Sequence, residues 1–143
     1  MDLDPQALIS AAQAVRRHAY APYSSYLVGA AVLDDQGRIH AGCNVENISY
    51  GLTLCAERNA IARMIAEGGR EVRAAAVVTK DGGTPCGMCR QTLAEFAAGN
   101  SAVPVFCASD DGQIREYDLR ELLPAAFDSD VVERTPSGPE GST

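Results

Sequence analysis

The order of helix-like and strand-like segments constrains the fold of this chain more than any other feature of its sequence. Apolar residues recur at helical spacing in some segments and as short β-branched runs in others, with turns rich in Gly, Asp and Pro between them. The predicted helices cover 5–19, 55–67, 87 or 89 to 98, and 119–123; the predicted strands cover 28–33, 39–44, 74–78, 103–108 and 114–117. Strands that alternate with helices favour a mixed sheet packed between helices. The sequence therefore predicts an α/β protein with a mixed five-stranded sheet.

The chain is long enough for one domain with a hydrophobic core of its own, because it has 143 residues of which 46% are hydrophobic. After Asp128 the composition shifts to Pro, Gly, Ser, Thr and Glu, which is typical of disordered segments. We therefore expect a catalytic domain over 1–128 and a largely disordered tail over 129–143. The N-terminal residues lack the features of a signal peptide and no long apolar run is present, so we expect a cytoplasmic protein without a membrane partner.

The charge of the chain disfavours a nucleic-acid partner. Its formal net charge is −7, and Lys80 is its single lysine. Because nucleic-acid binders usually present a basic face to the phosphate backbone, a small-molecule substrate is favoured over DNA or RNA.

Five cysteines are present, an odd number that argues against a disulfide framework in a chain without an export signal; they are Cys43, Cys55, Cys86, Cys89 and Cys107. In the Cys86-x-x-Cys89 pair two thiolates can meet one metal ion across a tight turn, and Cys55 can supply a third ligand. Cys55 and Cys89 both fall at predicted helix starts, where unpaired N–H groups favour thiolates. Three protein ligands leave one open position, which is the mark of a catalytic zinc ion.

Glu57 lies two residues after Cys55, and residues at that spacing do not face each other in a regular helix. The two side chains can converge only at the first turn, if the helix start points at the metal. Glu57 would then take a proton from zinc-activated water and return it to the substrate ring and the leaving amine. Arg58 and Arg90 follow the ligand regions directly, and either can offset the negative charge of the thiolates.

The chain resembles the cytidine deaminase family, and within it the short homotetrameric branch with three cysteine ligands. Six motifs carry the resemblance, in the family's order and spacing from Tyr20 to Phe127. They are Tyr20-Ala21-Pro22-Tyr23-Ser24, Val28-Gly29-Ala30-Ala31, Gly42-Cys43-Asn44-Val45-Glu46-Asn47, Cys55-Ala56-Glu57-Arg58, Pro85-Cys86-Gly87-Met88-Cys89-Arg90-Gln91 and Leu122-Leu123-Pro124-Ala125-Ala126-Phe127. The resemblance implies a three-layer α/β/α sandwich, one Zn²⁺ per subunit, a homotetramer with shared sites, and deamination of cytidine and deoxycytidine in pyrimidine salvage.

The resemblance also implies roles for individual residues. The implied zinc ligands are Cys55, Cys86 and Cys89, the implied proton shuttle is Glu57, the implied partner of the thiolates is Arg58, and the implied substrate-binding residues are Asn44, Glu46, Ala56, Tyr26, Thr84 and Phe127. Asn44 and Glu46 would hold the ribose 3′-hydroxyl, the Ala56 N–H would meet the pyrimidine O2, and the Thr84 carbonyl would accept from the exocyclic amine. Phe127 would belong to a neighbouring subunit's site. Tyr26 departs from the family, in which Phe is common at this position, and its hydroxyl adds polarity beside the nucleoside.

Several alternatives remain open from the residues alone. The Cys86-x-x-Cys89 pair is also compatible with a redox pair, or with a structural zinc site completed by Cys43 or Cys107, although neither gives Glu57 a role. Other activities to weigh are deamination of modified cytosine nucleosides, deamination of a polynucleotide, and a non-catalytic zinc module. His18 and His40 are expected on the surface, Cys43 and Cys107 as ordinary buried thiols, and Asp34-Asp35 and Asp110-Asp111 as solvated acids of hairpin turns.

Overall fold

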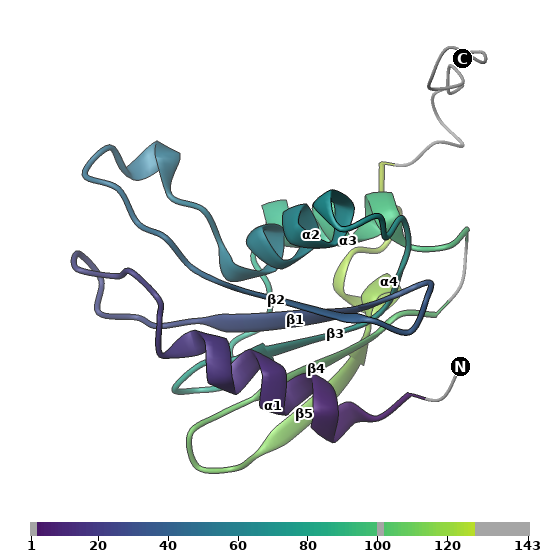
Figure 1. The fold of residues 1–143 in the computed structure, drawn as a ribbon, viewed down its shortest axis with the longest axis horizontal. Coiled ribbons are helices and arrows are strands. Elements are labelled where there is room, and N and C mark those ends of the chain that lie inside the picture. The colour runs from purple at the N-terminus through teal and green to yellow at the C-terminus, as the bar shows by residue number, and fades with distance from the viewer. Residues whose placement is uncertain (1–2, 100–101, 128–143) are drawn as a thin grey trace.

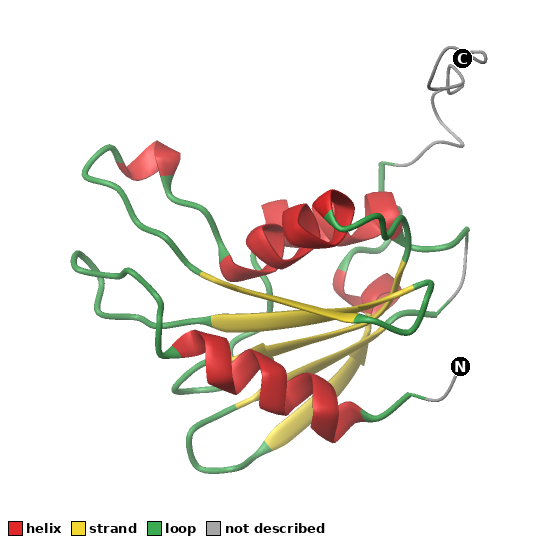
Figure 2. Ribbon diagram, in the orientation of Figure 1, coloured by secondary structure: helices red, strands yellow, loops and turns green. Residues whose placement is uncertain are grey.

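The computed structural model describes residues 3–99 and 102–127, which form a single sheet with helices on both of its faces (Figures 1 and 2). The helices are α1 (Pro5–Arg16), η1 (Tyr50–Leu52, a 3₁₀-helix), α2 (Ala56–Ala66), α3 (Gly87–Phe96) and α4 (Leu119–Leu122). The strands are β1 (Gly29–Asp34), β2 (Ile39–Cys43), β3 (Val72–Val78), β4 (Pro104–Ala108) and β5 (Ile114–Asp118). This order agrees with the sequence prediction, which lacked only η1 and placed the end of α1 about one turn too late.

The sheet has the strand order β2-β1-β3-β4-β5. The pair β3–β4 is parallel, and the pairs β1–β2, β1–β3 and β4–β5 are antiparallel. A parallel pair needs a crossover connection, and α3 lies in the connection between β3 and β4. Figure 1 shows α1 on one face of the sheet and α2 with α3 on the other. The predicted three-layer sandwich with a mixed five-stranded sheet is thus confirmed.

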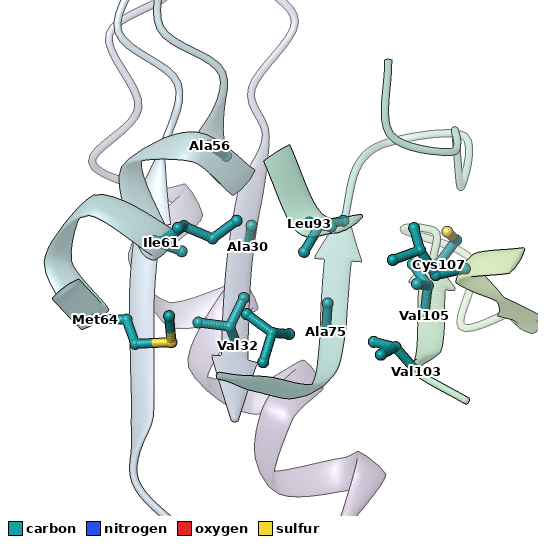
Figure 3. Packing of buried hydrophobic residues seen from close by; sticks show 13 residues of the cluster. Ala30, Val32, Ala56, Ile61, Met64, Ala75, Leu93, Val103, Val105 and Cys107 are labelled. Atoms are coloured by element: carbon teal, nitrogen blue, oxygen red, sulfur yellow. The ribbon is translucent and has the colours of Figure 1, made fainter. Parts of the chain in front are cut away.

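Each face of the sheet has a hydrophobic core. Figure 3 shows the core beneath α2 and α3, where Ile61, Met64 and Leu93 pack against sheet residues such as Val32 and Val105. The core beneath α1 is built from Leu8, Ile9 and Ala12 of the helix against the opposite face of the strands. All six residues of β1 are buried because this strand lies between both helical layers. Burial on both faces explains why β1 reads as a continuous apolar run up to Leu33.

Gly42 sets how closely α2 approaches β2. A Cβ atom built at Gly42 would lie 2.5 Å from the Ala60 nitrogen of α2, a distance that real Cβ atoms do not show. The helix backbone therefore rests directly on the strand at this point. This contact helps to fix where α2 begins, and Cys55 is its N-cap.

The predicted tail over 129–143 lies outside the described residues. Among the described residues, no helix is both long and apolar enough to cross a lipid bilayer.

His40 and Asp34 were expected in solvent, and both expectations are wrong. The His40 side chain is 2% exposed and that of Asp34 is 0% exposed. The imidazole lies between two carboxylates, with Nε2 at 2.7 Å from Asp34 Oδ2 and Nδ1 at 2.6 Å from Glu67 Oε1. Asp34 also accepts from the backbone N–H groups of Gln36 and Arg38. Four hydrogen bonds to the carboxylate, including one from the Arg38 guanidinium, allow this turn acid to be buried.

Asp34→Asn is expected to lower the free energy of unfolding by about 2 kcal/mol at pH 7. Burial by itself disfavours the ionised Asp34, but the hydrogen bonds from His40, Arg38 and Gln36 outweigh it and lower the pKa of the carboxyl to about 2. Because the folded-state pKa lies below the unfolded value, this stabilisation is present above about pH 4 and is lost as the pH falls through 2. Urea unfolding at pH 7 measures the loss.

Glu67→Gln is the matched control for this prediction, since Glu67 contacts the other nitrogen of the same imidazole but is 48% exposed. Solvent screens exposed pairs, so its expected cost is below about 1 kcal/mol. Equal losses in the two variants would contradict the argument that burial makes the Asp34 contact strong.

Candidate active site

One cavity collects most of the residues that the sequence analysis singled out. It has a volume of about 290 Å³, close to the lower end of the range for small-molecule sites. The lining residues are Ser24, Tyr26, Val28, Asn44, Glu46, Thr53, Cys55, Ala56, Glu57, Val77, Thr79, Gly83, Thr84 and Cys86. They come from the segments that follow α1, β2 and β3, from the end of β3 itself and from the first turn of α2. Figure 1 shows the segments after α1 and after β2 extending together beyond one end of the sheet.

Three thiols meet at one side of this cavity. The sulfur atoms of Cys55, Cys86 and Cys89 all lie within 4.8 Å of one another, with 3.8 Å between Cys55 and Cys86 and 3.5 Å between Cys86 and Cys89. Thiolates that share a tetrahedral Zn²⁺ with Zn–S bonds of about 2.3 Å lie about 3.8 Å apart. The spacing of these sulfurs therefore fits a zinc ion with three cysteine ligands.

The start of each helix brings the thiols together. Cys55 is the N-cap of α2, Cys86 is the N-cap of α3, and neither side chain caps its own helix with a hydrogen bond. Both sulfurs are thus free to turn towards a common point, while the unpaired N–H groups of the two helix starts favour negative charge there. Cys89 is the third residue of α3, within its first turn, and is fully buried.

Arg58 supplies positive charge to the cluster. Its Nη2 donates to Cys55 Sγ at 3.7 Å and to the Thr53 carbonyl at 3.1 Å. The pKa of the Cys55 thiol is lowered to about 5, first because Cys89 donates a hydrogen bond to it and then because Arg58 does. The pKa of Cys89 is raised in turn by this contact with Cys55. The cluster therefore favours a first thiolate at Cys55, the form that binds metal.

Glu57 lies beside the thiols in a nearly water-free environment. Its side chain lines the same cavity as Cys55, and the residue is 4% exposed. The first turn of α2 thus brings Cys55 and Glu57 together, as the sequence analysis required. Burial raises the pKa of Glu57 to about 6. A carboxyl group with such a pKa can both accept and release a proton near neutral pH.

Arg90, the other arginine that could have offset the charge of the thiolates, makes its hydrogen bonds elsewhere. Its Nε donates to the Pro85 carbonyl at 2.7 Å, its Nη1 to the Leu122 carbonyl at 2.7 Å and its Nη2 to Thr84 Oγ1 at 2.9 Å. The guanidinium thereby fixes the segment just before Cys86 against α4. Arg90 therefore acts on the cluster by holding the backbone that leads into Cys86.

The far side of the cavity is lined by polar groups that are already held in place. Asn44 Oδ1 accepts from the Val28 N–H at 2.9 Å, and its Nδ2 donates to the Tyr26 carbonyl at 2.9 Å. Glu46 accepts from the backbone N–H groups of Tyr23 and Ser24 and from the Ser24 hydroxyl. These hydrogen bonds lower the pKa of Glu46, and the bond from the Ser24 side chain is the largest cause. An amide and an ionised carboxylate therefore face the cavity in fixed orientations.

Of the two aromatic residues implied in substrate binding, Tyr26 lines the cavity and Phe127 does not. Tyr26 lines the cavity, but its hydroxyl donates to Asp81 Oδ1 at 2.6 Å. Phe127 lies outside the residues that line this cavity and is 64% exposed, while its carbonyl accepts from Gln91 Nε2 at 2.8 Å. The described chain brings together Asn44, Glu46, Ala56, Thr84 and Tyr26, and it does not add Phe127 to them.

Several residues of the cavity have no role that the sequence predicts. Ser24, Thr53 and Thr79 line it without having been given a role. Of these three, only Ser24 had a signal in the sequence, since it ends one of the quoted motifs; Val28, which also lines the cavity, begins another. Cys43 and Cys107 lie outside the three-thiol cluster, and burial raises the pKa of Cys107 to about 11. A three-thiol cluster beside a buried carboxyl, in a small-molecule cavity, is the arrangement of a zinc-dependent hydrolytic enzyme.

Comparison with known proteins gives the same class. Residues 3–105 match the family described as the cytidine and deoxycytidylate deaminase zinc-binding region. The cytidine deaminase of Halalkalibacterium halodurans is 46% identical over 127 residues, which are 87% of this chain and 95% of the relative. That of Mycobacterium tuberculosis is 42% identical over 135 residues, which are 93% of this chain and 96% of the relative. The crystal structure of cytidine deaminase from Burkholderia pseudomallei aligns with a TM-score of 0.80 at 44% identity and covers 87% of this chain and 100% of that one.

This chain therefore belongs to the cytidine and deoxycytidylate deaminase family. It is a zinc-dependent deaminase, and the spacing of its three thiols fits the metal that the family binds.

Proposed function

We propose that this protein hydrolyses free cytidine and deoxycytidine to uridine and deoxyuridine with release of ammonia. The observation that carries the proposal is one small cavity in which a three-thiol cluster and a buried Glu57 face the polar pair Asn44 and Glu46. The relatives named above are cytidine deaminases that match this chain over nearly their full length.

In this proposal each side of the cavity has a separate task. Cys55, Cys86 and Cys89 hold Zn²⁺, which when bound supplies a water molecule of lowered pKa. Glu57 would take one proton from that water and deliver it to the ring nitrogen N3 while the water oxygen bonds to C4. It would then carry the second proton, from the oxygen now on C4, to the amine, which leaves as ammonia when the C–N bond breaks. The raised pKa of Glu57 supports this assignment because a shuttle has to hold and release protons near neutral pH.

Substrate recognition follows from the polar groups at the cavity wall. We assign Asn44 and Glu46 to the ribose 3′-hydroxyl, since their hydrogen bonds to the protein fix an amide and a carboxylate in the cavity. The Ala56 N–H at the start of α2 is assigned to the pyrimidine O2, and the Thr84 carbonyl to the exocyclic amine. Both residues line the cavity.

The experiment that tests the proposal follows the absorbance of the cytosine band after purified protein is added to cytidine or deoxycytidine. The expected result is a rapid loss that disappears in chelator-stripped protein and returns with zinc. A cytosine oligonucleotide and modified cytosine nucleosides serve as comparison substrates. If the folded, zinc-loaded protein left both free nucleosides unchanged, the proposal would be wrong, whichever comparison substrate reacted.

We also propose that the protein works as a homotetramer in cytoplasmic pyrimidine salvage, with sites shared between subunits. Large apolar side chains on and near η1 support an assembly, since Ile48 is 78% exposed, Tyr50 73% and Leu52 64%. Phe127 is also exposed, as expected of a side chain assigned to a neighbouring subunit's site. Light scattering at assay concentration should give four times the mass of one chain, and the mass of a single chain would contradict the shared-site proposal.

A further inference from the structure

The Tyr26 hydroxyl joins two walls of the cavity that belong to distant parts of the sequence. Tyr26 lies in the segment between α1 and β1, and Asp81 lies in the turn between β3 and α3. The hydroxyl donates to Asp81 Oδ1 at 2.6 Å. This hydrogen bond raises the pKa of Tyr26, after burial as the larger cause, and is the first cause of the lowered pKa of Asp81. The single proton of the hydroxyl is therefore donated within the protein and is not available to a substrate.

The Asp81 side of this bond is a turn that is held by its own hydrogen bonds. The buried Thr79 hydroxyl accepts from the N–H groups of Gly82 and Gly83 at 2.8 and 2.9 Å and donates to Asp81 Oδ1 at 3.1 Å. Thr79, Gly83 and Thr84 all line the cavity. The position of Asp81 is thus coupled to the wall that leads into Cys86.

The Tyr26 side of the bond is tied to the groups assigned to the sugar. The Tyr26 carbonyl accepts from Asn44 Nδ2 at 2.9 Å, and the Tyr26 backbone N–H donates to Ser24 Oγ at 3.0 Å. The Ser24 hydroxyl in turn donates to Glu46. A continuous series of hydrogen bonds therefore runs from Glu46 and Asn44 through Tyr26 and Asp81 to Gly83.

Gly83 and Lys80 are further neighbours of the Tyr26 side chain. A Cβ atom at Gly83 would lie 3.0 Å from Tyr26 Oη, so the absence of a side chain at this position makes space for the hydroxyl. The Lys80 ammonium lies 5.8 Å from the centre of the Tyr26 ring, within the range of a cation–π contact.

We propose that Tyr26 and Asp81 are a positioning pair that sets the distance between the sugar-side wall and the zinc-side wall of the nucleoside cavity. The proposal rests on the proposed function, because it assigns the pair to binding of the same nucleoside. The pair acts on how well the cavity fits the nucleoside and takes no part in proton transfer. Its loss therefore weakens nucleoside binding and leaves the chemical step unchanged.

The test compares steady-state kinetics of zinc-loaded Tyr26→Phe, Asp81→Ala and the double variant with cytidine. Tyr26→Phe keeps the ring and removes the hydroxyl, and it is expected to raise KM about fivefold while kcat stays within about twofold. Asp81→Ala should raise KM at least as much. In the double variant the KM effect should be clearly smaller than the product of the two single effects, because both substitutions break one bond.

Two further variants separate the pair from general effects. Asp81→Asn keeps an oxygen that can accept from Tyr26, and it should restore most of the wild-type KM. Tyr20→Phe removes a hydroxyl from the same segment at a residue that is 54% exposed and outside the cavity lining, and it should leave KM unchanged. Thermal unfolding of each variant checks that it is folded.

The outcomes distinguish this proposal from the proposed function. If the wild type deaminates cytidine but Tyr26→Phe leaves KM unchanged, or if the single effects multiply fully in the double variant, the pair has no positioning role. A fall in kcat without a change in KM would equally overturn it. If the wild type neither binds nor deaminates a cytosine nucleoside, the proposed function fails and this proposal fails with it.

Discussion

Zinc-loaded Glu57→Gln is expected to lose about 10³-fold in kcat for cytidine while it keeps its fold and its metal. The amide has nearly the same shape as the carboxylate, so the packing of the first turn of α2 is preserved. It cannot carry a proton between water and the substrate, and the group that it replaces is buried in the cavity, 4% exposed, with its pKa raised to about 6 by burial. Single-turnover kinetics with zinc content measured on the same sample would check the prediction.

Glu67→Gln is the matched control for this experiment. It makes the same chemical change on the same helix, at the C-cap of α2 instead of its first turn. Its kcat should remain within about twofold of the wild type, because Glu67 lies at the opposite end of α2 from Glu57 and is not among the residues that line the cavity. A Glu57→Gln variant that turned over at a wild-type rate would remove Glu57 from the chemistry and would favour a different proton carrier.

Cys86→Ala is expected to lower zinc affinity by about 10²-fold or more and to abolish measurable deamination at limiting zinc. Cys86 is the exposed member of the cluster, so alanine at this position opens no cavity in the core. The remaining thiols of Cys55 and Cys89 provide two ligands, too few for the three-ligand site that a catalytic zinc requires. Elemental analysis after dialysis against a graded series of chelator concentrations measures the loss.

Cys43→Ala is the control for the loss of a thiol as such. Cys43 is half-buried and lies outside the three-thiol cluster. This variant should bind one zinc per chain as tightly as the wild type. Loss of zinc from Cys43→Ala, or full retention by Cys86→Ala, would show that the ligand set differs from the one proposed.

Metal binding also contributes to stability, because the three thiols converge only in the folded chain. Removal of zinc should therefore lower the melting temperature of the wild type and should change that of Cys86→Ala much less. A wild-type melting temperature that does not respond to zinc would contradict a tightly held ion at this cluster.

Much of the fold could be read from the sequence because its signals are local. The buried run of β1 and the apolar stripe of α2 follow directly from which side chains leave water. The turn before β2 was also predicted, but the environment of its first acid was not. Asp34 is buried because His40 and Arg38 fold back on it, and His40 is buried for the same reason. Neither contact can be recognised from amino-acid composition or from the periodicity of apolar residues.

The candidate site divides in the same way. The Cys86-x-x-Cys89 spacing and the Cys55–Glu57 pair are local, and each indicates a metal site with a proton carrier at a helix start. The distances between the three sulfurs are set by how α2 and α3 are placed on the sheet, to which the close contact of Gly42 with α2 contributes. That Arg58 contacts Cys55 while Arg90 holds the backbone at Pro85 depends on the same placement.

The sequence by itself determined the order of the elements, the residue types of the metal cluster and the chemistry that those types allow, since each follows from residue types and from spacings within short stretches of the chain. Only the tertiary structure decided that Tyr26 donates to Asp81, that Asp34 holds His40 and that Arg90 supports the backbone at Pro85. Tyr26 and Asp81 are 55 positions apart in the sequence. A hydrogen bond between two polar side chains needs a fixed distance and direction, and for partners far apart in the chain only the packed sheet and its helices provide them.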